Sequence, residues 1–222
     1  MKNSRVINGG LLTLIFILLL SVVFMVSLVQ IALNLIDYPQ GYIILFIQTL
    51  AGMLLMYLPY LFKRFGIIFA PLATASLAAF SFAALVMGSL WDFYVLIHRY
   101  DFILHFVSGF LMTLVSYSLP AIAYPKVKFG VGFLSVFAFS FAMLLGKIWE
   151  VWEFFLDSMF GSNTQTWAVR ATGEVLVGQA ALHNTMWDII FNILGGLLAC
   201  FIAFLAIKHN KPWLKLYQIR KG

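Results

Sequence analysis

Three groups of ionisable side chains fall at corresponding ends of three apolar segments, and together they could bind a cation or move a proton. The first group opens one segment and contains Asp101 and His105. The second group closes the next segment and contains Lys147, Glu150, Glu153 and Asp157. The third group opens the last segment and contains one ionisable residue, Asp188, with the neutral amides Asn184 and Asn192 on the same face. Ionisable groups at membrane depth are costly and usually functional, so we expect a site where the three groups meet.

Carboxylate oxygens and an imidazole nitrogen are common ligands of divalent cations, which makes a metal site the first hypothesis. Its predicted ligands are His105, Glu150 and Asp188, and the ion would be zinc, manganese or magnesium. The other polar side chains would be catalytic or supporting: Glu153 or Asp101 as base, Lys147 as phosphate ligand, and Asn192, Asp157 and Asn184 as supports.

The composition restricts the chain to one class of protein. Of its 222 residues, 63% are hydrophobic and 10% are charged, with a mean hydropathy of +1.00. A bilayer can cover that much apolar surface, whereas a soluble fold cannot bury it. We predict an all-α polytopic membrane helical bundle, with residues 1–222 in one transmembrane domain. Six segments have the length of about 20 residues that a span needs: 10–34, 41–62, 66–90, 101–119, 129–157 and 184–207.

The distribution of Lys and Arg predicts the orientation of these spans. Most of the 14 basic residues fall on one side of them: Lys2, Arg5, Lys63, Arg64, Lys126, Lys128, Lys208, Lys211, Lys215, Arg220 and Lys221. Only Arg99 and Arg170 fall on the other side, and Lys147 lies within a span. Because cytoplasmic loops are enriched in Lys and Arg, both termini are predicted to be cytoplasmic. The three ionisable groups and a long polar loop at 158–183 are then external.

The net charge of +6 does not indicate nucleic-acid binding, because the basic residues lie in short loops and in the tail at 208–221. We interpret this tail, which contains Trp213 and Tyr217, as an interfacial anchor attracted to anionic lipid. Small residues along the span at 66–90 predict close helix packing. The single cysteine, Cys200, can form no internal disulfide.

The three ionisable groups also resemble a pattern found in two bacterial membrane families. The matching motifs are Asp101-x-x-x-His105-Phe106, Trp149-Glu150-Val151-Trp152-Glu153, and Trp187-Asp188 followed by Asn192, Gly195 and Gly196. The chain resembles the YjdF-like inner-membrane family, and more weakly the VanZ-like family, which is linked to glycopeptide resistance. The resemblance implies a multi-pass protein of the bacterial cytoplasmic membrane with a shared polar site, and it implies no particular reaction.

Three functions from different classes fit these observations. A metal-dependent hydrolase or transferase could act on an envelope lipid or a lipid-linked substrate, whose polar part lies at the depth of the site. A proton- or cation-coupled transporter or flippase would use a titrating carboxylate, and the polar stripe from Ser108 to Ser116 favours it. A non-enzymatic scaffold or sensor would use the same side chains as a structural ion-pair network. Membrane lipids are predicted partners in all three.

Overall fold

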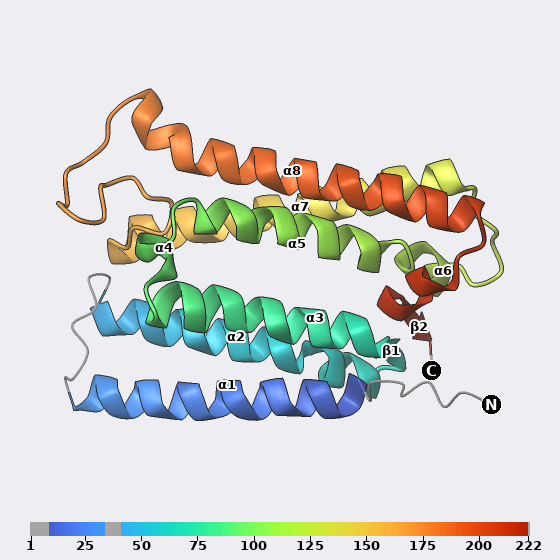
Figure 1. Cartoon of the computed structure of the whole chain (residues 1–222), viewed down its shortest axis with the longest axis horizontal. Helices are drawn as coiled ribbons and strands as arrows, with labels where there is room; N and C mark the ends of the chain where they lie inside the picture. The colour runs from blue at the N-terminus through green and yellow to red at the C-terminus, as the bar shows by residue number, and fades with distance from the viewer. Residues whose placement is uncertain (1–8, 34–40, 222) are drawn as a thin grey trace.

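The fold, taken from a computed structural model that describes residues 9–33 and 41–221, consists mainly of long helices arranged in two layers (Figure 1). One layer contains α1 (Gly9–Ala32), α2 (Gly41–Arg64) and α3 (Pro71–Ser81). The other layer contains α5 (Tyr100–Ser116), α7 (Val131–Phe160) and α8 (Gln179–Lys208). Each of the six predicted spans overlaps one of these helices, of which α3 is the shortest with 11 residues.

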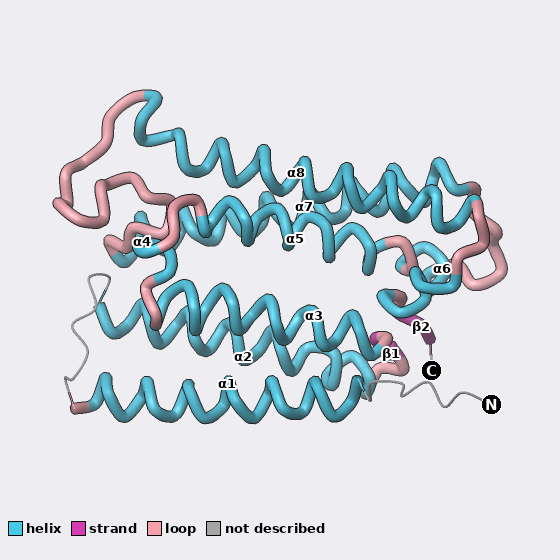
Figure 2. The backbone as a smooth tube through the Cα atoms, in the orientation of Figure 1, coloured by secondary structure: helices cyan, strands magenta, loops and turns pink. Residues whose placement is uncertain are grey.

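Shorter elements complete the two ends of this bundle. The π-helix η1 (Phe82–Leu90) continues α3, and α4 (Phe93–Leu96) leads into α5. At the opposite end lie α6 (Leu119–Ala123), the 3₁₀ helix η2 (Pro212–Tyr217), and the strands β1 (Ile67–Phe69) and β2 (Ile219–Lys221). Figure 2 shows that the loops gather at these two ends. The loop between α7 and α8 lies at the α4 end, and the chain finishes at the other (Figure 1).

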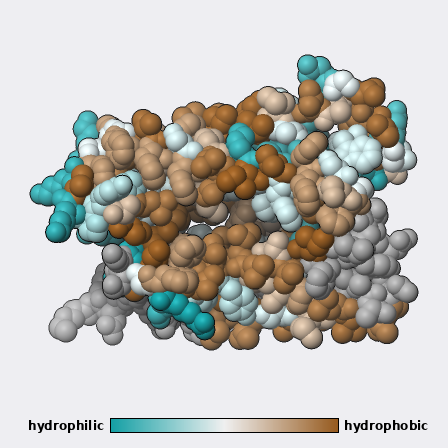
Figure 3. Space-filling view, turned by 180° about the vertical axis from the view of Figure 1, so that it is seen from behind, coloured by the Kyte–Doolittle hydropathy of each residue, from teal (hydrophilic) through white to brown (hydrophobic). Residues whose placement is uncertain are grey.

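Four helical stretches in the described ranges are long and apolar enough to cross a membrane: Pro71–Ser89, Tyr100–Ala123, Val131–Phe160 and Gln179–Lys208. A helix suits such sequences because it pairs its own backbone polar groups, which lipid cannot do. In Figure 3, hydrophobic side chains predominate along the middle of the molecule, and hydrophilic ones gather mainly towards its ends. The predicted class of helical membrane protein agrees with this architecture.

Small side chains let the helices approach one another closely. On α3, Ala73, Ala75 and Ala78 are buried, as expected from the small residues of this segment. The second layer has a matching core around Ala138 of α7 and the alanines Ala199, Ala203 and Ala206 of α8. The two cores thus combine these small side chains with larger ones such as Leu114 and Met56.

Three predicted edges differ from those of the structure. The third span was expected from residue 66, but its helix begins only at Pro71, because the preceding residues form β1 and pair antiparallel with β2. Proline suits the first helical position, where its missing N–H costs nothing. The loop expected at 158–183 covers only residues 161–178, since α7 continues to Phe160 and α8 begins at Gln179.

The basic tail, predicted as an interfacial anchor, also packs against the helices. Leu214 and Ile219 are 4% and 7% exposed, so they belong to the interior of the bundle. The backbone N–H of Ile219 donates a hydrogen bond to Ser118 Oγ at 2.9 Å. Pairing with β1 holds the last residues in place. The tail is therefore a packed part of the fold.

Candidate metal centre

Helices α5 and α8 cross so closely that two glycines are required. A Cβ atom on Gly109 of α5 would overlap the carbonyl oxygen of Asn192, and one on Gly195 of α8 would overlap that of Phe106. The two backbones are therefore in contact about one turn beyond the ionisable residues. This contact places His105 of α5 and Asp188 of α8 side by side.

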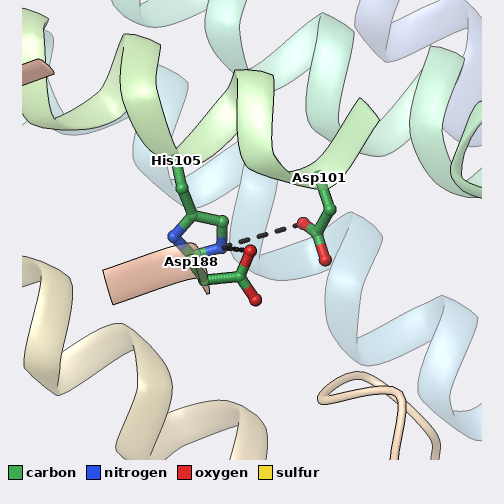
Figure 4. Close-up of side chains that lie close together, drawn as sticks. All are labelled: Asp101, His105 and Asp188. Carbon is green, nitrogen blue, oxygen red and sulfur yellow. Dashed lines mark ion pairs between the residues drawn. The ribbon is translucent and has the colours of Figure 1, made fainter. Parts of the chain in front are cut away.

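Figure 4 shows the side chains of Asp101 and Asp188 close to the His105 ring. Its Nε2 atom is 3.7 Å from Asp101 Oδ1 and 3.8 Å from Asp188 Oδ1. Its Nδ1 atom is 3.6 Å from Glu150 Oε1 on α7. The imidazole thus faces carboxylates from all three helices, with two acids on one nitrogen and one acid on the other.

Two asparagines of α8 hold this arrangement. The Asn184 side-chain amide donates hydrogen bonds to Asp188 Oδ2 at 2.5 Å and to Asp101 Oδ2 at 3.3 Å. Asn192 donates to the His105 carbonyl oxygen at 3.3 Å and to Ser108 Oγ at 3.1 Å. The structure therefore brings both predicted supporting asparagines into contact with the cluster.

Several buried polar atoms of the cluster have no hydrogen-bond partner among the described residues. They are both carboxylate oxygens of Glu150, Asp188 Oδ1, Asn192 Oδ1 and Lys147 Nζ. Asp188 is fully buried and Glu150 is 7% exposed. Leaving such groups unpaired costs about 1–3 kcal/mol each, and more when they are charged. These atoms are therefore suited to bind something that the polypeptide does not supply.

The described part of the chain contains two sets of three residues that could bind a metal ion. Within each set, one ligand atom per residue lies within 4.8 Å of the others. One set is Asp101, His105 and Asp188, and the other is His105, Glu150 and Glu153. The predicted trio of His105, Glu150 and Asp188 is not among them. Glu150 and Asp188 face different nitrogens of the imidazole, so a single ion would not reach all three.

Glu153 lies one turn beyond Glu150 on the same face of α7. It is 8% exposed and accepts a hydrogen bond from Trp149 Nε1 at 3.0 Å. Its neighbour Asp157 was expected to support the cluster but instead holds the loop. The Asp157 carboxylate accepts hydrogen bonds from Ser162 Oγ, Thr164 N, Thr164 Oγ1 and Gln165 N at 2.5–2.9 Å.

With this geometry established, comparison with known proteins places the chain in a family. A family model described as "Predicted membrane protein (DUF2238)" matches residues 12–211. The chain belongs to this family. The match is consistent with the resemblance to YjdF-like membrane proteins and gives no support to the VanZ-like one. No curated protein and no solved structure matches the chain significantly.

The family match spans all the residues of the cluster, and the structure adds two that the sequence analysis missed. The Tyr94 ring of α4 makes an edge contact with the Tyr100 ring and leaves no room for a Cβ atom on Gly88. The Arg170 guanidinium of the loop lies 5.4 Å from the centre of the Tyr94 ring, a cation–π distance. No local motif marks either residue, because the loop folds back over α4 only in the assembled molecule.

The charges of the cluster also affect the pKa of Tyr94. Burial raises the pKa of the Tyr94 phenol well above its ordinary value, and the carboxylates of Asp101 and Glu153 raise it further. The positive charge of Arg170 opposes this shift of the pKa. The phenol therefore stays protonated and uncharged at neutral pH.

Proposed function

We propose that this member of the DUF2238 family is a six-span protein of the bacterial cytoplasmic membrane with both termini in the cytoplasm. The charge distribution supports this orientation. Basic residues of the α2, α6–α7 and C-terminal segments lie at one end, whereas Arg99 and Arg170 lie at the other. By the positive-inside rule, the cluster and the loop at 161–178 then face the outside.

We propose further that Asp101, His105 and Asp188 bind a divalent cation. The assignment rests on one observation: in each aspartate, the two carboxylate oxygens have different partners. Asn184 holds the Oδ2 atom of each aspartate, which leaves both Oδ1 atoms facing His105 Nε2 at 3.7 and 3.8 Å. One nitrogen and two carboxylate oxygens suit zinc or manganese better than magnesium, which prefers oxygen alone.

Glu150 has a separate role in this assignment. Its carboxylate faces His105 Nδ1, the nitrogen on the far side of the ring from the two aspartates. Ligating histidines commonly donate their second N–H to a carboxylate, which fixes the tautomer and the ring orientation. Glu150 is therefore a positioning residue for His105 rather than a ligand.

The most specific function that this site supports is hydrolysis of, or transfer from, an envelope lipid or lipid-linked substrate. A bound cation would polarise a phosphoryl or carbonyl oxygen of such a substrate. Glu153, in the same cluster, would accept a proton from the attacking hydroxyl group. Lys147 Nζ, which has no hydrogen-bond partner among the described residues, would bind an anionic oxygen of the head group.

Metal analysis of the purified protein tests the assignment. We expect about one zinc or manganese ion per chain, lost in Asp188→Asn and retained in Asp92→Asn. Asp92 is a suitable control because it is exposed and has a left-handed backbone (φ 59°) that asparagine tolerates. Retention should decrease as the pH is lowered, because protons compete for the same ligand atoms. Equal metal content in wild type and Asp188→Asn would refute the site.

One observation favours proton- or cation-coupled transport as a second candidate. Polar side chains continue from the cluster to the far end of α5, where Ser116 is buried and Thr113 is completely buried with no partner for its hydroxyl among the described residues. A conducting path would use such groups. Proteoliposomes would decide between the two: transport predicts a cation or proton flux that Thr113→Val abolishes, whereas the enzyme tolerates that change.

A further inference from the structure

The end of the bundle opposite the cluster contains a hollow of about 440 Å³. It exists because the C-terminal tail packs against α6 and the turn that leads into α7. Ser118 Oγ accepts the N–H of Ile219 at 2.9 Å, and the Gln218 carbonyl accepts the N–H of Ala70 at 2.9 Å. These two bonds hold β2 as one wall of the hollow.

The lining of the hollow is amphipathic. Apolar side chains from α6, the turn and α7 form most of it: Ala121, Ile122, Pro125, Val127, Phe129 and Leu134. Arg220 of β2 lies in the wall and is exposed. The shape and chemistry therefore suit a ligand with an apolar part and an anionic part.

The surroundings of the hollow are strongly basic. Lys126 and Lys128 alternate with the lining residues of the turn, and both are exposed. None of the eight acidic residues of the chain falls within residues 119–135 or 208–222. Arg220 thus lines the hollow, Lys126 and Lys128 flank its lining residues in the sequence, and these two segments contain no acid to oppose the three positive charges.

We propose that this hollow binds one anionic phospholipid of the adjoining leaflet. An acyl chain would lie along Ile122, Val127 and Leu134, and the phosphate would lie among the three cations. A free phosphate would gain nothing from the apolar wall, and a zwitterionic lipid would gain less from the cations. Basic pockets at the cytoplasmic side of membrane helices are suited to anionic head groups. The proposal is independent of the metal site.

Native mass spectrometry in detergent, with phosphatidylglycerol or phosphatidylcholine added, tests the proposal. We expect one phosphatidylglycerol to be retained per chain, in preference to phosphatidylcholine. Arg220→Gln should weaken retention about fivefold, and adding Lys126→Gln and Lys128→Gln should weaken it about fivefold more for each charge. Lys211→Gln is the matched control, because Lys211 is an exposed cation of the same tail that, unlike Lys126 and Lys128, is not next in the sequence to any lining residue.

Three outcomes would overturn the proposal. The first is that Lys211→Gln weakens retention as much as Arg220→Gln, which would indicate attraction to the basic end as a whole. The second is that inorganic phosphate displaces the lipid at equal concentration, which would indicate a simple anion site. The third is that Val127→Asp, which places a charge in the apolar wall, leaves retention unchanged. Thermal unfolding of each variant shows that a loss of lipid is not a loss of fold.

Discussion

At the residue scale, the two oxygens of each carboxylate have different partners. Asn184 holds one oxygen of Asp101 and one of Asp188, and His105 faces the other two. The sequence spacing predicted that these residues share helix faces, because positions three and four apart do so. It could not predict which imidazole nitrogen faces which acid, since that depends on how α5, α7 and α8 are rotated against one another.

The contacts of Asp157 also could not be predicted from sequence spacing, and they lead to a testable prediction. Helical spacing placed it with Glu153, but hydrogen bonds to Ser162, Thr164 and Gln165 direct it to the loop. Asp157→Asn leaves one acceptor oxygen where two were in use, so we expect a loss of about 1–3 kcal/mol in unfolding free energy. Thermal unfolding measures the loss of unfolding free energy, and protease cleavage measures the loosening of the loop.

Metal content should remain unchanged in Asp157→Asn, since Asp157 contacts none of the proposed ligands. Glu174→Gln is the control, because Glu174 is an exposed acid in the same loop. If Asp157→Asn lost metal while the loop stayed resistant to protease, Asp157 would belong to the cluster after all.

At the scale of the elements, the crossing of α5 and α8 sets the site. The apolar segments predicted the helices well, because a bilayer requires about 20 such residues per span. The strand β1 was not predicted, because its three residues pair with a segment about 150 positions later and carry no local signal. The end of α7 at Phe160 was also missed, although Gly161, which has a φ of 65°, is the kind of residue that commonly ends a helix.

Substitution of the crossing glycines tests the importance of this contact. In Gly109→Ala and Gly195→Ala the new methyl group would overlap a backbone carbonyl that cannot move alone. We expect each to lower the unfolding free energy by about 1–3 kcal/mol and to reduce metal retention. Gly132→Ala on α7 is the matched control, because nothing lies within 4 Å of its Cβ position. Equal stability of Gly109→Ala and Gly132→Ala would mean that the helices cross less closely.

At the scale of the whole molecule, the two ends of the bundle have opposite character. Acids and the long loop lie at one end, and cations and the packed tail lie at the other. The sequence predicted this polarity from the positions of Lys and Arg alone. It could not predict that the tail packs into the fold, because the burial of Leu214 and Ile219 depends on residues distant in the chain.

Cysteine labelling in whole cells tests the proposed orientation. In a Cys200→Ala background, Thr172→Cys in the loop should react with a membrane-impermeant maleimide from outside. Lys126→Cys, in the turn before α7, should react only after the membrane is permeabilised. Both positions are exposed, so accessibility in the folded protein does not differ between them. The reverse pattern would place the cluster on the cytoplasmic side.

The most direct test of the central claim is the melting temperature of Glu150→Gln measured with and without zinc or manganese. If the cluster is a ligand site, wild type gains stability on adding the ion. Glu150→Gln should then fold equally well without metal but bind the ion about 10–100-fold more weakly, because His105 loses its orienting carboxylate. If instead wild type shows no shift with either ion and Glu150→Gln is unstable, the cluster is a structural network and the proposed metal centre does not exist.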